Sequence, residues 1–320
     1  MDTLEEIGLD RKDLRVIRNL NWNQKATVQI GEKRTEWIDI KKGVRQGCIL
    51  SPDLFSLYSQ RVMDELEGME GVKVGGRNIN NIGYADGTVM VADSEEKLRE
   101  LVMALHRACT AWGLKINFGQ GKTEVMGITK RAEELNVNIR MEGRHITQIE
   151  KYKYLGVMVT KDGRCDTELL KRIGMAKTTF NSMRRILTNM NINMRLRTRL
   201  VKCFVWSVFM YGCEVWTLDK RLKGRIEALE MWILRRMMRI PWTARVTNER
   251  VMEMAGVGRE LMGAVRSRQL KFLGHLLRHD CLEKDVFLGK IERRRARGRQ
   301  RIKFATSLVE DIPGEVTVAS

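Results

Sequence analysis

The residue best suited to chemistry is Asp86, in the segment Tyr84-Ala85-Asp86-Gly87. Apolar and β-branched runs flank this segment, over 79–84 and 88–92. Asp-Gly between two such runs favours a tight β-hairpin, because glycine accepts the positive φ that the turn requires. The pattern therefore predicts Asp86 at a hairpin tip and Gly87 in the turn. A carboxylate there is either ordinary turn chemistry or a metal ligand that faces a phosphate.

A second polar segment, 43–47, precedes a predicted helix. Ser51 followed by Pro52 is typical of a helix start, because serine accepts from unpaired amides and proline fits the first turn. An apolar stripe then predicts a helix over 52–66. The next predicted helix ends at Gly113 and opens with the capping box Asp93-x-x-Glu96.

The remaining elements of the first half must hold these two segments in place. A helix is expected over 10–20, and alternating residues predict a hairpin of 25–30 with 36–40. Strands are expected at 114–117, 123–128, 137–141 and 154–160. This order favours an α+β layer, with helices on one face of an antiparallel sheet.

After Asp162-Gly163 the pattern becomes helical throughout. We expect helices at 169–187, 194–211, 222–238 and 260–277. Four tryptophans of this region are expected in the core rather than stacked on nucleotides, and they are Trp206, Trp216, Trp232 and Trp242.

The composition favours a polyanionic partner. Lys and Arg number 58 against 40 Asp and Glu, which gives a formal charge of +18 over 320 residues. RNA or DNA is the simplest such partner, and an anionic membrane is a weaker alternative. No apolar run is long enough to span a bilayer, the N-terminus has no secretion signal, and no C-x-x-C pair supports zinc. We expect an intracellular chain, in the nucleus or the cytoplasm, with no obligate protein partner indicated.

A dense basic run covers 290–303 near the end of the chain. It suits a solvated loop, a nuclear localisation signal or an arm that contacts phosphates. Under the last interpretation the contacts come from Arg293, Arg294, Arg295, Arg297, Arg299, Arg301 and Lys303.

The ordered set of motifs resembles the reverse transcriptases of non-LTR (LINE-type) retrotransposons. The segment 43–55 is similar to their template- and nucleotide-facing loop and helix, although Ile49 stands where the family usually has proline. Tyr84-Ala85-Asp86-Gly87 resembles the catalytic hairpin, whose pattern is Tyr-Ala-Asp-Asp. The segments 113–123 and 152–156 resemble the next palm motif and the primer grip. Later motifs are similar to the family's C-terminal extension.

The resemblance implies a polymerase palm and thumb. It divides the chain into a partial palm with the end of the fingers over 1–162, a helical thumb over 163–221 and a basic helical extension over 222–320. It also implies Mg²⁺ as the cofactor.

The resemblance also implies roles for single residues. Asp86 would be catalytic and bind metal, with Tyr84 lining the hairpin base. Arg45, Gln46 and Gly47 would face template and nucleotide, and Lys122 would contact the triphosphate. The ordinary alternatives are core packing for the tyrosine, loop or helix-entry geometry for 45–47, and a solvated turn lysine.

Two departures from the family pattern bear on activity. Gly87 replaces the second aspartate of the hairpin, and the sequence begins too late to contain the upstream strand that carries the family's other essential aspartate. A lone carboxylate binds Mg²⁺ weakly, because nothing offsets the cost of dehydrating the ion. We therefore expect an N-terminally truncated, inactive remnant of an RNA-directed DNA polymerase. The alternative is a non-enzymatic protein that binds nucleic acid through its basic helices and tail.

Overall fold

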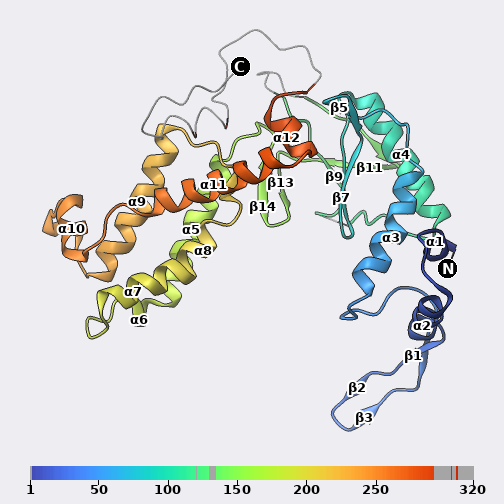
Figure 1. Ribbon diagram of the computed structural model, residues 1–320, viewed down its shortest axis with the longest axis horizontal. Helices are drawn as coiled ribbons and strands as arrows, with labels where there is room; N and C mark the ends of the chain where they lie inside the picture. Colours follow the sequence, from blue (N-terminus) through green and yellow to red (C-terminus); the bar gives the residue numbers. More distant parts are fainter. Residues whose placement is uncertain (1, 120, 130–134, 292–303, 305–307, 309–320) are drawn as a thin grey trace. The chain divides into compact units, whose positions relative to one another are not determined.

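The structure is a computed structural model that describes residues 2–119, 121–129, 135–291, 304 and 308 (Figure 1). The chain divides into two compact units. Unit 1 comprises Met1–Lys73, Arg77–Thr123 and Asn138–Ile146, and unit 2 comprises Val74–Gly76, Glu124–Val137 and Thr147–Ser320. In the described parts of the chain, no helix has the length and apolar character needed to cross a membrane.

Unit 1 alternates helices with short strands. Its helices are α1 (Asp2–Glu6), α2 (Arg11–Asn21), α3 (Ser51–Asp64) and α4 (Glu95–Ala111). Its strands are β1 (Gln24–Ala26), β2 (Gln29–Ile30), β3 (Lys33–Arg34), β4 (Ile38–Ile40), β6 (Arg77–Ile79), β7 (Asn81–Tyr84), β8 (Gly87–Met90), β10 (Arg140–Met141) and β11 (Arg144–His145), and β5 (Val72–Val74) begins in it.

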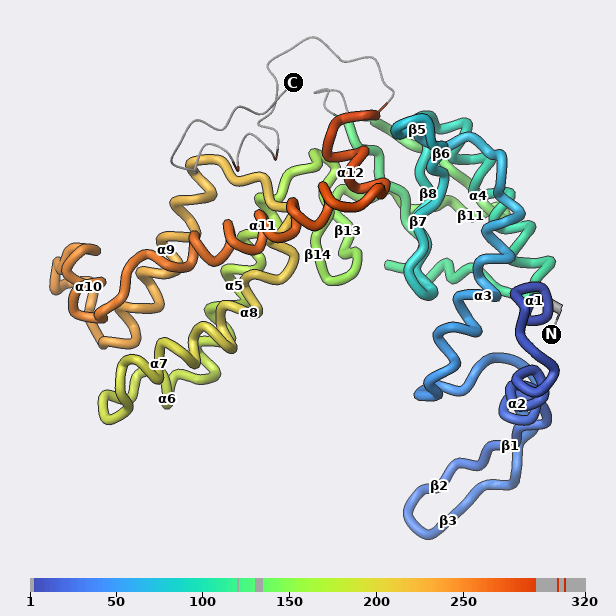
Figure 2. Tube along the Cα trace, in the orientation of Figure 1, coloured from blue at the N-terminus to red at the C-terminus, as the bar shows by residue number. Residues whose placement is uncertain are grey.

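Strands β1 to β4 confirm the first predicted hairpin. β1 pairs antiparallel with β4, and β2 pairs with β3. Figure 2 shows them as one long hairpin that extends beyond α2. Its apolar side chains are exposed, with Ile30 at 77% and Trp37 at 66%.

Two small apolar clusters hold the helices of unit 1. Leu14 and Ile17 of α2 pack with Leu4 of α1 and with partly buried leucines of α3. Val62 of α3 packs with α4, and partly buried Leu114 and Ile116 join the same cluster. The predicted strand at 114–117 is therefore wrong, since the described backbone there forms no strand and its apolar residues support α3 and α4 instead.

Both predicted helix caps differ from the structure. The hydroxyl of Ser51 donates to the carbonyl of Arg45 at 2.6 Å instead of capping α3. Helix α4 is capped by Ser94, whose Oγ accepts from the amide of Lys97 at 3.3 Å. Asp93 is instead paired with the Lys97 ammonium at 3.0 Å, and the N-cap lies one residue later than predicted.

Unit 2 is mostly helical, as predicted. Its helices are α5 (Asp166–Ser182), α6 (Arg184–Leu187), α7 (Met194–Leu200), the π-helix η1 (Val201–Val205), α8 (Trp206–Phe209), the 3₁₀-helices η2 (Cys213–Val215) and η3 (Trp242–Ala244), α9 (Lys220–Met237), α10 (Asn248–Ala255), α11 (Leu261–Arg278) and α12 (Leu282–Phe287). Its strands are β9 (Glu124–Val125), β12 (Thr147–Gln148), β13 (Lys151–Tyr154) and β14 (Val157–Thr160).

The strands described in both units pair two by two rather than forming one sheet. All of these pairs with a recorded register are antiparallel except β9 with β12, which is parallel. Strands of two to four residues expose too few backbone groups and side chains to build a wide sheet. The structure agrees with the mixed α+β class. The described strands do not form the single antiparallel sheet, with helices on one face, that the sequence predicts.

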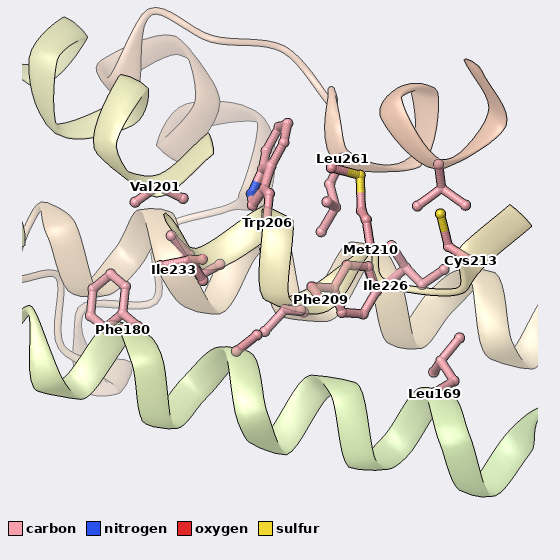
Figure 3. Packing of buried hydrophobic residues seen from close by; sticks show 14 of the residues in the cluster. Leu169, Phe180, Val201, Trp206, Phe209, Met210, Cys213, Ile226, Ile233 and Leu261 are labelled. Carbon is pink, nitrogen blue, oxygen red and sulfur yellow. The ribbon is translucent and has the colours of Figure 1, made fainter. Parts of the chain in front are cut away.

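The main core lies among the helices of unit 2 (Figure 3). Leu169 and Phe180 of α5 face Phe209 of α8 and Ile226 and Ile233 of α9, and all five are buried. Each such side chain contributes about 1.5–3 kcal/mol of burial free energy. A second cluster joins α9 to α10.

Candidate active site

The hairpin that carries Asp86 forms as predicted, but its turn lies one residue earlier. Tyr84 of β7 pairs with Gly87 of β8, so Ala85 and Asp86 make the turn. Ala85 takes the positive φ, at 51°, whereas Gly87 has no positive φ. The Asp86 carboxylate is exposed at the tip, and Tyr84 is 63% exposed, so it does not pack in a core.

Glycine at position 87 is therefore not required by the backbone. A Cβ atom built there meets the Tyr84 carbonyl oxygen at 3.4 Å, which is ordinary van der Waals contact. The expectation that Gly87 relieves turn strain is wrong, because the strained residue is Ala85. The main chemical effect of this glycine is the loss of a carboxylate beside Asp86.

The loop before α3 is fixed by its own backbone. The carbonyl of Arg45 accepts from the amide of Cys48 at 3.2 Å and from the Ser51 hydroxyl at 2.6 Å. Gly47 has φ 86°, a backbone conformation in which a residue with a side chain would be strained. A hydrogen bond from the Leu50 backbone is the largest cause that lowers the pKa of the Cys48 thiol.

This fold turns the predicted nucleotide-facing side chains outward. Arg45 and Gln46 are both exposed. Lys122 is also exposed, on a turn in which its amide donates to the Gly119 carbonyl at 3.0 Å. Thr123 closes the same turn by donating to the Asn117 carbonyl at 2.7 Å.

The structure does not join these residues through direct contacts. Across the described residues, no hydrogen bond or ion pair links Asp86 with Arg45, Gln46 or Lys122. Nor do the described residues contain a group of three or more His, Cys, Asp or Glu able to hold a metal ion. A two-ion site needs converging carboxylates, so the residues present do not fit one.

The segment that resembles a primer grip forms a hairpin rather than the strand predicted over 154–160. β13 pairs antiparallel with β14, and Leu155 and Gly156 make the turn with φ values of 46° and 83°. The hydroxyl of Tyr211 donates to the Leu155 carbonyl at 2.9 Å. The Gly156 carbonyl accepts from Arg172 Nη2 at 2.7 Å.

A buried ion pair braces this hairpin against α5. Glu168 Oε1 accepts from Arg172 Nε at 2.5 Å, and Glu168 Oε2 accepts from the amide of Met158 in β14 at 2.7 Å. The guanidinium of Arg172 also lies over the Tyr211 ring, 4.5 Å from its centroid. Sequence reasoning missed these residues. Opposite charges four residues apart in an apolar helix were the available signal.

The tryptophans of unit 2 divide into three environments. Trp206 and Trp216 are buried at 7% and 1% exposure, as predicted. Trp232 is half-buried and lies near two cations, with Lys177 Nζ at 5.3 Å and Arg236 Cζ at 4.4 Å from its ring centroid. For Trp242 the prediction of a core position is wrong, because its side chain is 95% exposed.

The predicted phosphate-contacting residues Arg293, Arg294, Arg295, Arg297, Arg299, Arg301 and Lys303 lie outside the described residues. Their role stays a prediction.

A carboxylate at the tip of a hairpin and a strongly basic composition suit a domain that handles nucleic acid. Residues 2–159 match the family model described as reverse transcriptase (RNA-dependent DNA polymerase). This segment, just under half of the chain, is similar to reverse transcriptase domains, and the relatives that the chain matches include proteins of non-LTR retrotransposons.

Three relatives illustrate this kinship. An uncharacterised transposon-derived protein of Caenorhabditis elegans is 26% identical over 65% of this chain and 75% of its own length. The RNA-directed DNA polymerase from mobile element jockey of Drosophila funebris is 22% identical over 64% of this chain and 23% of its own length. The Pol polyprotein from the type-1 retrotransposable element R2 of Nasonia vitripennis is 25% identical over 44% of this chain and 14% of its own length. The alignment thus spans less than a quarter of either polymerase protein.

Proposed function

We propose that this chain is a reverse transcriptase domain that binds nucleic acid but does not extend a primer on its own. One observation supports the second part most directly. Asp86 stands at the hairpin tip with Gly87 after it, and the described residues provide no metal-binding cluster around it.

The chemistry of nucleotidyl transfer explains why one carboxylate is insufficient. Two divalent ions about 3.5–4 Å apart must clamp the attacking and leaving oxygens. Mg²⁺, which reverse transcriptases generally use, is held by carboxylates together with substrate phosphates. A single exposed aspartate provides one ligand, which does not offset the free-energy cost of removing water from the ion. In this proposal Asp86 keeps its position and loses its catalytic effect.

The proposal assigns the parts of the chain as the resemblance implies. Residues 1–162 form the partial palm, 163–221 the thumb and 222–320 the basic extension. Arg45, Gln46, Gly47 and Lys122 serve the template and the incoming nucleotide from exposed loops. The braced β13–β14 hairpin serves as the primer grip.

The binding part of the proposal is supported by charge. A net charge of +18 favours contact with nucleic acid phosphates, whether the strand is RNA or DNA. The non-enzymatic alternative shares this property, but the family match favours a reverse transcriptase origin.

Primer extension on an RNA template, with Mg²⁺ or Mn²⁺, tests the proposal. We expect no extension by the wild type under conditions in which the primer–template is bound. Extension that disappears in Asp86→Asn would contradict the claim of inactivity. Failure of the wild type to bind any primer–template would contradict the claim of binding.

A further inference from the structure

Trp242 is the most exposed large apolar side chain described, at 95%. It lies in η3, on the loop between α9 and α10, and Figure 1 shows α10 beside the C-terminal end of α9. The neighbouring residues Pro241, Thr243, Ala244 and Arg245 are exposed as well. The described protein therefore leaves almost the whole surface of this side chain accessible.

The first side of the loop is fixed where it leaves α9. The amide of Ile240 donates to the Arg235 carbonyl at 2.9 Å. Arg239 has φ 55°, and its Nε donates to the Thr188 carbonyl at 2.9 Å. A non-glycine residue keeps a left-handed backbone only when its surroundings fix it.

The second side of the loop is fixed where it enters α10. Arg235 Nη2 donates to the Val246 carbonyl at 2.7 Å and to Asn248 Oδ1 at 3.0 Å. Arg245 is also left-handed, with φ 48°, and the Ala244 amide donates to the Pro241 carbonyl at 3.1 Å. The loop is thus a built structure that holds the Trp242 ring in solvent.

The charges around the ring indicate the chemistry of its ligand. Between residues 235 and 250 the sequence has one acidic residue, Glu249, and the basic residues Arg235, Arg236, Arg239, Arg245 and Arg250. Within the described residues, Arg239 and Arg245 form no ion pair. An anionic ligand is favoured at this loop.

We propose that Trp242 stacks on an unpaired base of a single-stranded nucleic acid whose phosphates lie against Arg239 and Arg245. Aromatic rings set among cations bind single strands in this way, and stacking tolerates every base because each has a π-face. An apolar protein partner would instead be matched by a contiguous apolar patch, and the exposed neighbours of Trp242 are small, polar or basic. This inference rests on the nucleic-acid binding proposed above.

The test measures binding of a fluorescein-labelled single strand of mixed sequence, about 20 nucleotides long, by anisotropy. Trp242→Ala should weaken binding about 5- to 150-fold, as expected for one stacked base. Trp242→Phe keeps a ring and should lose much less, whereas Trp242→Leu keeps apolar area without a ring and should resemble the alanine variant. The dependence of affinity on salt should stay unchanged, because stacking releases no counterions.

Trp37→Ala is the matched control, since Trp37 is 66% exposed in the hairpin of unit 1. It should bind as the wild type does. Wild-type affinity in Trp242→Ala or Trp242→Leu, or an equal loss in Trp37→Ala, would overturn the stacking assignment alone. Self-association that disappears in Trp242→Ala without a change in strand binding would assign the ring to a protein contact. A wild type that binds no strand would overturn both proposals.

Discussion

At the residue scale, the backbone at position 87 does not require glycine, whereas metal binding beside Asp86 would require a carboxylate there. Gly87 occupies a strand with no positive φ, and the nearest atom to a Cβ there is the Tyr84 carbonyl oxygen at 3.4 Å. An aspartate would fit the same backbone. The glycine therefore removes a ligand and makes little difference to the fold.

Gly87→Asp should accordingly leave stability almost unchanged. We expect a change in unfolding free energy within about 0.5 kcal/mol, as for an unstrained surface substitution. Gly156→Asp is the contrasting control, because Gly156 has φ 83°, a backbone conformation in which a side chain is strained. Urea denaturation of both variants measures the difference. Equal losses would show that position 87 is strained after all.

At the element scale, a buried ion pair attaches the β13–β14 hairpin to α5. The side chains of Glu168 and Arg172 are 1% and 6% exposed. Removing Arg172 leaves Glu168 Oε1 without its partner, although Glu168 Oε2 keeps the Met158 amide at 2.7 Å and the Lys171 ammonium at 3.3 Å.

Arg172→Met should destabilise the chain by about 3–5 kcal/mol. The double variant Glu168→Gln with Arg172→Met should lose less, because no buried carboxylate then lacks the guanidinium that its Oε1 contacted. Arg250→Met is the matched control, since the Arg250–Glu253 pair is 62% and 69% exposed and contributes at most about 1 kcal/mol. Denaturant midpoints decide the matter, and similar values for both single variants would refute the bracing role.

Glu230 gives unit 2 a dependence on pH. Burial raises the pKa of this carboxyl above its ordinary 4.5, although the amides of Glu260 and Leu261 donate to it and oppose the shift. A carboxyl with a raised pKa in the folded state binds its proton there while the unfolded chain has already lost it. Its contribution to stability is therefore greatest below pH 4.5 and falls as the pH rises toward the folded-state pKa.

Glu230→Gln should remove this decline, because the amide does not titrate. Its oxygen can still accept from the two backbone amides that open α11. Melting temperatures from pH 4 to pH 7 should show a smaller downward trend in the variant than in the wild type. Identical pH profiles would contradict the raised pKa.

The elements also show which features the sequence could predict. Long apolar stripes gave α9 and α11 to within two residues, because the period of 3.6 persists over many residues. Strands of two to four residues are too short to show a period in the sequence. Their positions depend on which other segment pairs with them. Trp206 lies in the apolar run 203–213, whereas Trp242 has Pro241 before it and Arg239 and Arg245 within three residues. The sequence predicts both in the core, and the loop after α9 exposes Trp242.

At the scale of the whole molecule, charge dominates. The net charge of +18 should make affinity for duplex DNA fall by about 0.9 log units per log unit of salt for each phosphate contacted. Changing the seven basic residues of 293–303 to glutamine should reduce that slope if the run contacts phosphates. Changing its arginines to lysine keeps the charge and should preserve the slope. A slope that is flat in the wild type would contradict phosphate-driven binding.

Single-nucleotide incorporation on a prebound RNA primer–template tests the central claim most directly. Wild type and Gly87→Asp are each saturated with labelled primer–template, binding is verified by anisotropy, and nucleotide is added with Mg²⁺. The account predicts that both proteins bind and that neither extends the primer, because one restored carboxylate beside Asp86 does not complete the metal site. Extension by the wild type, or its recovery in Gly87→Asp, would contradict this account.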